Sequence, residues 1–168
     1  MALREIVTIP QPVLRRKAHK VTDFGPELQQ LIDDMVETMR EAPGVGLAAP
    51  QVNVPLRVVV VEFGDEEDET VPPRLYTFVN PQITRFSEEI KTGTEGCLSI
   101  PGLVGDVDRP IEVTIKGLNR FGKPAKLKAS GWLARIFQHE VDHLDGILFT
   151  DRATQVRKLQ EGEAVPVD

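Results

Sequence analysis

The stretch most suggestive of chemistry is residues 139–143, which read HEVDH. On a helix, His139 and His143 lie one turn apart on the same side. Two imidazoles so placed can share a tetrahedral metal ion, and Glu140 beside them can move protons to and from water at that ion. The spacing therefore predicts a metal-dependent hydrolytic centre. The alternative is a helix whose two histidines only make local hydrogen bonds.

A metal hydrolase also needs a third protein ligand and an open coordination position. The extended pattern HExxHxxGxxH begins correctly with Gly146, but its last position is Phe149, which cannot bind a metal. A downstream glutamate, as in thermolysin-like peptidases, would have to be Glu161 or Glu163. Both lie in segment 160–166, which its polar composition predicts to be frayed.

The remaining candidate is Cys97, the only cysteine of the chain. A lone cysteine is more often a small buried hydrophobic residue. Beside an HExxH motif that lacks another third ligand, the metal-binding interpretation is favoured. A single cysteine cannot form an intramolecular disulfide, which fits a reducing intracellular setting.

Two helices are predicted around these residues. Segment 22–43 has the apolar spacing of an amphipathic helix with Pro26 in its first turn, and its stripe is expected to pack against a sheet. Segment 131–144 carries HExxH and is apolar on most sides, so we expect a buried helix with Ser130 as its cap.

Strand patterns outnumber the helices. Segments 56–63 and 75–79 read as buried strands, and segments 111–117 and 125–129 read as an antiparallel hairpin. The fold class is therefore α+β, with mixed or antiparallel sheets packed around a central buried helix that carries HExxH.

Length and composition set further limits. With 168 residues, 40% of them hydrophobic, we expect one domain over 1–168, with a polar C-terminal tail from about 152 to 168. The net charge of −6 argues against a nucleic-acid or anionic-membrane binder. Acidic residues fill positions 65–69, which we interpret as a solvated loop. No membrane span or secretory signal is recognisable in the chain.

Three segments together resemble the signature motifs of the peptide deformylase family, and they occur in the same order. They are 44–51 (GVGLAAPQ), 95–99 (EGCLS) and 138–146 (QHEVDHLDG). The resemblance extends from residue 10 to about Asp151. It implies hydrolysis of the N-formyl group from the N-terminal formylmethionine of new polypeptides, with release of formate.

The resemblance also implies roles for single residues. Cys97, His139 and His143 would bind one divalent metal ion, with Fe²⁺ expected and Zn²⁺, Ni²⁺ or Co²⁺ as possible occupants. Glu140 would act as base and then as acid. The Gln51 side-chain amide and the Leu98 backbone N–H would stabilise the oxyanion.

Substrate contacts follow from the same resemblance. Backbone at Val45, Gly46 and Gly96 would pair with the extended peptide. Trp132 and Ile136 would line an apolar pocket for the methionine side chain, together with Val45, Leu98 and His139. Ordinary core packing is the alternative for Trp132 and Ile136.

Glu95 and Arg109 match positions that form a supporting ion pair in relatives, with surface charges as the alternative. The implied partners are N-formylmethionyl nascent peptides at the ribosome, in the cytoplasm. Some relatives carry an arginine shortly after the second motif, whereas residues 102–106 here read GLVGD, so peptide preference beyond the first residue stays open.

Other classes of protein remain to be separated from this one. A divergent member could act on another N-acyl amine, an endopeptidase could use Glu163 as its third ligand, and a metal-binding domain could have no activity at all. Substitutions at Cys97 and Glu140 distinguish these readings.

Overall fold

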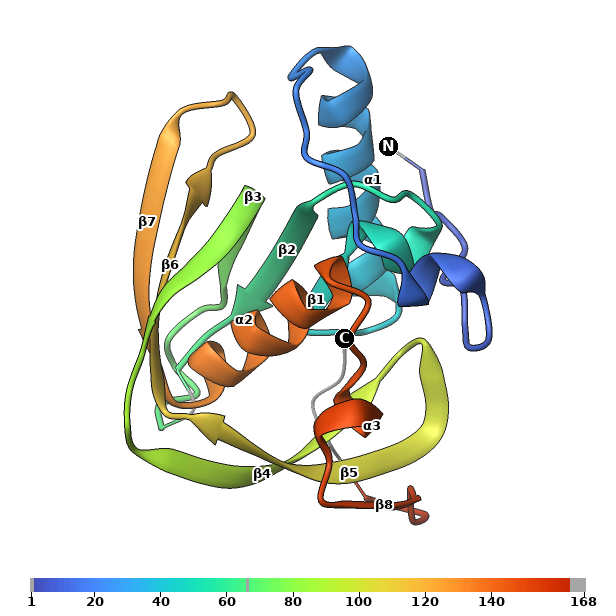
Figure 1. Cartoon of the computed structure of the whole chain (residues 1–168), viewed down its shortest axis with the longest axis vertical. Coiled ribbons are helices and arrows are strands. Elements are labelled where there is room, and N and C mark those ends of the chain that lie inside the picture. Colours follow the sequence, from blue (N-terminus) through green and yellow to red (C-terminus); the bar gives the residue numbers. More distant parts are fainter. Residues whose placement is uncertain (1, 66, 164–168) are drawn as a thin grey trace.

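The computed structural model describes residues 2–65 and 67–163, in which helix α2 lies between two β-sheets (Figure 1). The larger sheet has the strand order β1-β2-β3-β6-β7 and the smaller one β4-β5-β8. The strands are β1 (Gly46–Ala48), β2 (Val58–Phe63), β3 (Arg74–Phe86), β4 (Ile90–Cys97), β5 (Ile100–Pro110), β6 (Glu112–Leu118), β7 (Pro124–Ser130) and β8 (Gln155–Lys158). The helices are α1 (Pro26–Glu41), α2 (Gly131–Leu144) and α3 (Phe149–Arg152), with 3₁₀ turns at Pro12–Arg15 and Ala49–Val52. The α+β class is confirmed, and the named strand pairs are antiparallel.

Strand β2 is buried on both faces, as its sequence predicts. Val58 and Val60 pack into the apolar cluster under α1, whereas Val59 and Val61 pack into the cluster under α2. None of these four side chains is exposed. Because successive side chains of a strand point to opposite faces, one continuous valine run can serve both cores.

Helix α1 confirms the prediction for segment 22–43. Pro26 occupies its first turn, where the fixed φ of proline suits the start of a helix. Its apolar stripe packs against residues of β1 and β2, among them Leu47 and Val60.

Helix α2 follows directly from the predicted β6–β7 hairpin. It is buried from Ala134 to Leu144, which confirms the expectation of a central buried helix. Ser130 occupies the N-cap position, but its side chain makes no capping hydrogen bond, so the predicted cap was wrong in that respect. The start of the helix is instead fixed by Gly131 N–H, which donates to the Ile111 carbonyl at 2.8 Å.

The β4–β5 hairpin was not anticipated from the sequence. Strand β4 reads IKTGTEGC, in which glycine and charged residues hide the apolar alternation of a strand. Its pairing with β5 stabilises it, and the turn Leu98–Ser99 joins the two strands. Figure 1 shows this hairpin passing beneath α2.

The polar segment after Asp151 is more ordered than its composition suggests. Gln155–Lys158 forms β8, which pairs with β5. Residues 160–163 were predicted to be frayed, but they form a turn in which Glu163 pairs with Arg157. The rest of the segment predicted to be frayed, 164–166, lies outside the described residues.

Two expectations about the surface concern charge and membranes. The described members of the acidic run, residues 65 and 67–69, are exposed between β2 and β3, as predicted for a solvated loop. Within the described ranges, no helix combines the length and the apolar character that crossing a membrane requires.

Candidate metal centre

Helix α2 and the β4–β5 hairpin bring three possible metal ligands together. The donor atoms of Cys97, His139 and His143 all lie within 4.8 Å of one another, and the three residues are buried. Cys97 Sγ is 3.4 Å from His143 Nε2. One thiolate and two imidazoles form a donor set that suits a divalent transition metal such as zinc or iron. The three residues therefore fit a metal ion by both position and chemistry.

The cysteine is placed by an irregularity at the end of β4. The strand register shifts between Gly96 and Cys97, so that Cys97 pairs with Ile100 next to the turn. The thiol lies in a small apolar cluster that includes Phe149. The Phe149 ring stacks on His139, with ring centroids 6.1 Å apart. Phe149, which cannot be a ligand, thus packs beside a candidate ligand.

Glu140 is fully buried next to β1. A Cβ built on Gly46 would lie only 2.5 Å from Glu140 Oε2. The absence of a side chain at Gly46 therefore gives the carboxylate its position beside the histidines.

Replacing Gly46 by alanine is accordingly expected to displace the Glu140 carboxylate. We expect hydrolytic turnover at this centre to fall by about 100-fold, the cost that a misplacement of about 1 Å can carry. Metal bound at the centre should remain, because none of the three candidate ligands is changed. The measurement is kcat together with metal content per chain, and loss of the metal itself would contradict this explanation.

Gln51 is buried and its side chain is held at both ends. Its Oε1 accepts from Ala48 N–H at 3.0 Å, and its Nε2 donates to Ser99 Oγ at 3.2 Å. Nε2 also lies 3.7 Å from Cys97 Sγ. The amide N–H group therefore points toward the cysteine side of the centre. Ser99 was not singled out from the sequence, although it lies in the EGCLS motif.

The N-terminal segment fixes the backbone around Gln51 and the hairpin turn. Val7 N–H donates to the Gln51 carbonyl at 2.8 Å, and Ile9 N–H donates to the Ser99 carbonyl at 3.0 Å. Leu98, half-buried, lies in this same turn directly after the cysteine.

The residues expected to contact substrate come from several elements. Val45, Trp132 and Ile136 pack into one apolar cluster. Gly46 belongs to β1 and Gly96 to β4, and each of these strands is the edge strand of its sheet.

Glu95 is the buried carboxylate that contacts a candidate ligand. Its Oε1 lies 2.9 Å from His139 Nδ1, and Arg109 donates to both carboxylate oxygens at 2.6 and 2.8 Å. Glu95 and Arg109 thus form a buried ion pair. A carboxylate on the far nitrogen of a histidine fixes the ring orientation.

Burial raises the pKa of Glu95, but hydrogen bonds from Arg109 and His139 outweigh this effect. The pKa of Glu95 therefore lies well below its ordinary value of 4.5. Burial lowers the pKa of Arg109, and its bonds to Glu95 and Asp142 reverse this, so the net shift is upward.

This shift predicts a loss of stability in acid. Below pH 4.5 the unfolded chain takes up a proton at Glu95, whereas the folded chain keeps the carboxylate ionised. Urea unfolding of the metal-free protein should show a stability that falls between about pH 5 and pH 3. Glu95→Gln should reduce that slope by up to about 1.4 kcal/mol per pH unit. Parallel slopes for the two proteins would rule out this contribution.

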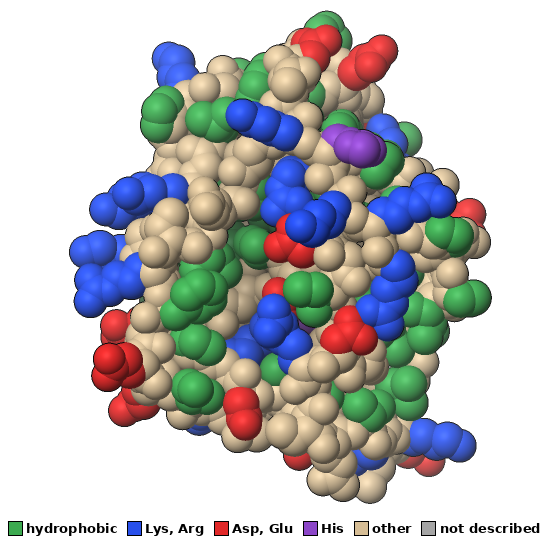
Figure 2. Space-filling model, viewed as in Figure 1, with side chains coloured by type: hydrophobic (Ala, Val, Ile, Leu, Met, Phe, Trp, Pro, Cys, Tyr) green, Lys and Arg blue, Asp and Glu red, His purple; other side chains and the backbone are tan. Residues whose placement is uncertain are grey.

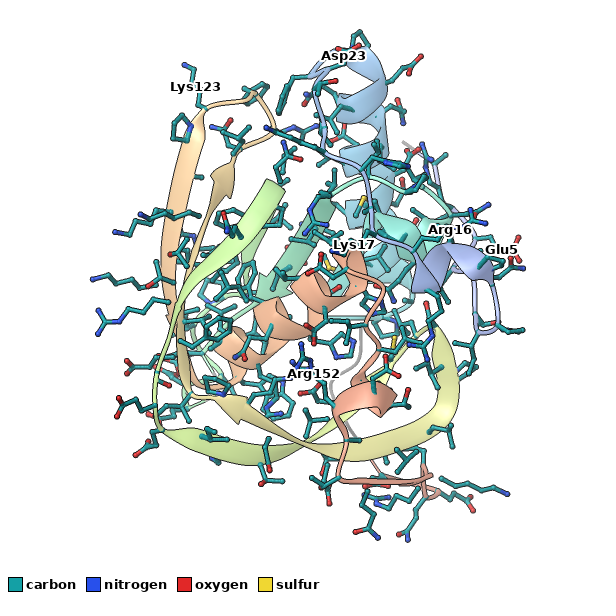
Figure 3. The ribbon with its side chains drawn as sticks, in the orientation of Figure 1. Glu5, Arg16, Lys17, Asp23, Lys123 and Arg152 are labelled. Atoms are coloured by element: carbon teal, nitrogen blue, oxygen red, sulfur yellow. The ribbon has the colours of Figure 1, made fainter. Side chains whose placement is uncertain are left out.

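Asp142, inside the HExxH motif, was missed from the sequence as a contact of this network. It accepts from Arg109 Nη1 at 3.0 Å and from Arg152 at 2.7 and 3.0 Å. Arg152 comes from α3 and lies beside α2 (Figure 3). The ion pair between Arg152 and Asp142 links α3, which carries Phe149, to α2, which carries both histidines. The sequence signal for Asp142 was a carboxylate on a helix that is apolar on most sides and predicted to be buried.

The other proposed third ligand is not brought to the histidines. Glu163 pairs with Arg157 of β8, at 2.7 Å from Oε1. Within residues 2–65 and 67–163, the cluster able to hold a metal consists of Cys97, His139 and His143.

A hollow opens beside α2, where Gln138, Val141 and Asp142 line it. It has a volume of about 800 Å³ and mixed charge, with Lys20, Arg57 and Arg152 beside Asp108 and Asp145. Figure 2 shows basic and acidic side chains interspersed on the face of the molecule that is seen in Figure 1.

The family model of polypeptide deformylase matches residues 3–159 of the chain. The chain belongs to the polypeptide deformylase family. The peptide deformylase of Symbiobacterium thermophilum is 52% identical over 161 residues, which cover 96% of this chain and 71% of that protein. The peptide deformylase of Natranaerobius thermophilus is 47% identical, with 96% of this chain and 99% of that protein covered.

Solved deformylase structures share the fold. The peptide deformylase of Legionella pneumophila superposes with a TM-score of 0.81 at 43% identity, covering 90% of this chain and 86% of that one. A Met-Ala-Ser-bound class I type b peptide deformylase of Acinetobacter baumannii gives 0.82 at 39% identity, covering 89% and 98%.

The chain is therefore an enzyme of this metal-dependent deformylase family, and its relatives are bacterial-type deformylases. It hydrolyses the N-formyl group of N-terminal formylmethionine on new polypeptides. The family match and the Cys-His-His cluster agree that the reaction uses a metal ion.

Proposed function

We propose that Cys97, His139 and His143 hold one divalent metal ion and that deformylation takes place beside it. The observation that carries this proposal is the convergence of the three donors within 4.8 Å next to the buried Glu140. When bound, such an ion acts as a Lewis acid that makes water acidic and polarises the formyl carbonyl.

Glu140 is the group that moves the proton. It takes a proton from the attacking water and delivers it to the leaving nitrogen, acting as base and then as acid. Its burial against Gly46 keeps the carboxylate in place for both transfers.

The negative charge that develops on the formyl oxygen needs donors that are already in position. The Gln51 amide, held by Ala48 and Ser99, supplies one N–H group. The Leu98 backbone N–H, in the turn after the cysteine, supplies the other. Neither donor has to reorganise during the reaction, because the hydrogen bonds of Gln51 and the hairpin fix them beforehand.

The peptide lies between two open sheet edges. Edge strands carry backbone groups that can pair with an added extended chain. Backbone at Val45 and Gly46 on one side and at Gly96 on the other therefore aligns the substrate. The methionine side chain enters the apolar cluster at Trp132 and Ile136. The Met-Ala-Ser bound to the Acinetobacter relative supports a peptide of this class.

The proposed native ion is Fe²⁺, with Zn²⁺, Ni²⁺ or Co²⁺ able to occupy the same ligands. The thiolate gives negative charge to the cation and so favours a softer divalent metal. The chain works as a single catalytic domain over 1–168 in the cytoplasm, where it meets nascent formylated peptides at the ribosome.

Oxygen should distinguish iron from zinc. The iron-loaded protein is expected to lose activity in air, because the ion or the Cys97 thiolate is oxidised. The zinc-loaded protein serves as control. The measurement is the decay of formate release with and without oxygen, and equal decay rates for the iron form would contradict the expectation.

The test of the reaction is formate release from formyl-Met-Ala-Ser by Fe²⁺-loaded protein under anaerobic conditions. Acetyl-Met-Ala-Ser is the matched substrate for a divergent acylase. Turnover of the formyl peptide alone supports deformylation. Turnover of the acetyl peptide alone would redirect the assignment to another N-acyl amine, and no turnover with one metal bound per chain would refute the proposed catalysis.

A further inference from the structure

Arg135 lies on α2 one turn before His139 and is buried, with a side chain only 7% exposed. It was not predicted from the sequence to take part in the site. Its Nη1 donates to Glu95 Oε2 at 2.6 Å and to the Val107 carbonyl at 2.9 Å, and its Nη2 donates to the Lys91 carbonyl at 2.7 Å. One guanidinium therefore joins α2 to β4 and β5.

Gly93 and Trp132 pack around this guanidinium. A Cβ on Gly93 would lie 2.7 Å from Arg135 Cζ, so glycine is needed there for the arginine to fit. On another side, the Trp132 ring has its centroid 5.4 Å from Cζ. Such packing holds the planar group in one orientation.

The guanidinium completes the hydrogen bonds of Glu95. Oε1 contacts Arg109 Nη2 and His139 Nδ1, whereas Oε2 contacts Arg109 Nε and Arg135 Nη1. Each oxygen thus has two partners, and the carboxylate plane is fixed. Without Arg135, Oε2 would keep one partner and β4 would lose a link to α2.

We propose that Arg135 is a positioning residue. Its guanidinium, packed between Gly93 and Trp132, holds Glu95 against His139 and fixes β4, which carries Cys97, relative to α2, which carries both histidines. This inference rests on the proposed metal site of Cys97, His139 and His143. It assigns to Arg135 no contact with substrate or metal.

The test measures how fast Co²⁺-loaded full-length protein loses its metal to excess chelator, together with the visible absorption spectrum of the bound Co²⁺. Arg135→Met should release the metal about 10- to 100-fold faster, the range known for losing a partner of a metal ligand. Its Co²⁺ bands should also shift, since they report ligand geometry. Arg135→Lys should release the metal at a rate between those of wild type and Arg135→Met, because one ammonium group cannot reach all three acceptors.

Gly93→Ala keeps every charge but places a Cβ where the Arg135 guanidinium lies, so it should also speed release of the metal. Arg40→Met is the matched control, since it removes an exposed arginine whose Nε and Nη2 contact Glu62 at 3.0 and 2.7 Å and not Glu95 or a candidate ligand. Urea unfolding of the metal-free forms measures any purely structural cost.

The outcomes separate the two proposals. A wild-type protein without tightly bound Co²⁺, or Cys97→Ala that binds it equally well, would overturn the metal site and this inference together. Suppose that wild type binds Co²⁺ tightly but that Arg135→Met or Gly93→Ala releases it at a rate within twofold of the wild-type rate. This result would overturn the inference alone. If Arg135→Met does not fold, Arg135→Lys and Gly93→Ala decide, and failure of both to fold would assign Arg135 to the scaffold only.

Discussion

Glu140→Gln should lower formate release by about 10²- to 10⁴-fold, the range of general acid–base catalysis, while one metal ion per chain stays bound. The amide cannot accept the proton of the attacking water, yet it has nearly the size of the carboxylate. Because Glu140 is fully buried beside Gly46, the substitution leaves little room for rearrangement. Single-turnover formate release and metal analysis on the same sample provide the measurement.

Glu112→Gln is the matched control, since this carboxylate is exposed at the start of β6. It should leave formate release unchanged. Activity of Glu140→Gln close to wild type would show that another group moves the proton. Loss of the metal in Glu140→Gln would mean that the residue supports the ligands, and the catalytic role would have to be withdrawn.

Cys97→Ala should abolish both tight metal binding and turnover. It removes one of three protein donors, so the loss of metal affinity should exceed the roughly 100-fold that removing a ligand's hydrogen-bond partner can cost. Cys97 is buried in a small apolar cluster, and alanine preserves most of that packing. The fold should therefore survive, as circular dichroism of the metal-free protein would show.

The same variant separates deformylase from endopeptidase chemistry. Should Cys97→Ala keep its metal and activity while Glu163→Gln loses them, Glu163 would be the third ligand. The ion pair between Glu163 and Arg157 makes the opposite result the expected one. Cys97→Asp adds a harder oxygen donor and should recover some binding with altered metal preference.

Local sequence patterns predicted the elements whose structure depends mainly on residues close together in the chain. The i, i+4 spacing places His139 and His143 on one side of a helix wherever that helix packs. The valine run of β2 and the alternation of β6 carry their own burial pattern. The three motifs also indicate the family by themselves.

Other features depend on pairings that no local pattern contains. Strand β4 has too few apolar residues to be predicted from its own sequence, and its pairing with β5 stabilises it. Glu95 and His139 are 44 residues apart in the chain, and Glu95 and Arg135 are 40 apart. Such neighbours are chosen by how the hairpin packs on α2.

The sequence by itself determined the kind of chemistry, because donor types and helical spacing are properties of the chain. Only the tertiary structure decided which glycines make room, at Gly46 and Gly93, and that Arg135 joins Arg109 in holding Glu95. The physical reason is that a buried carboxylate must satisfy both of its oxygens with whatever donors the packing brings near. Those donors come from distant elements, so the fold alone selects them.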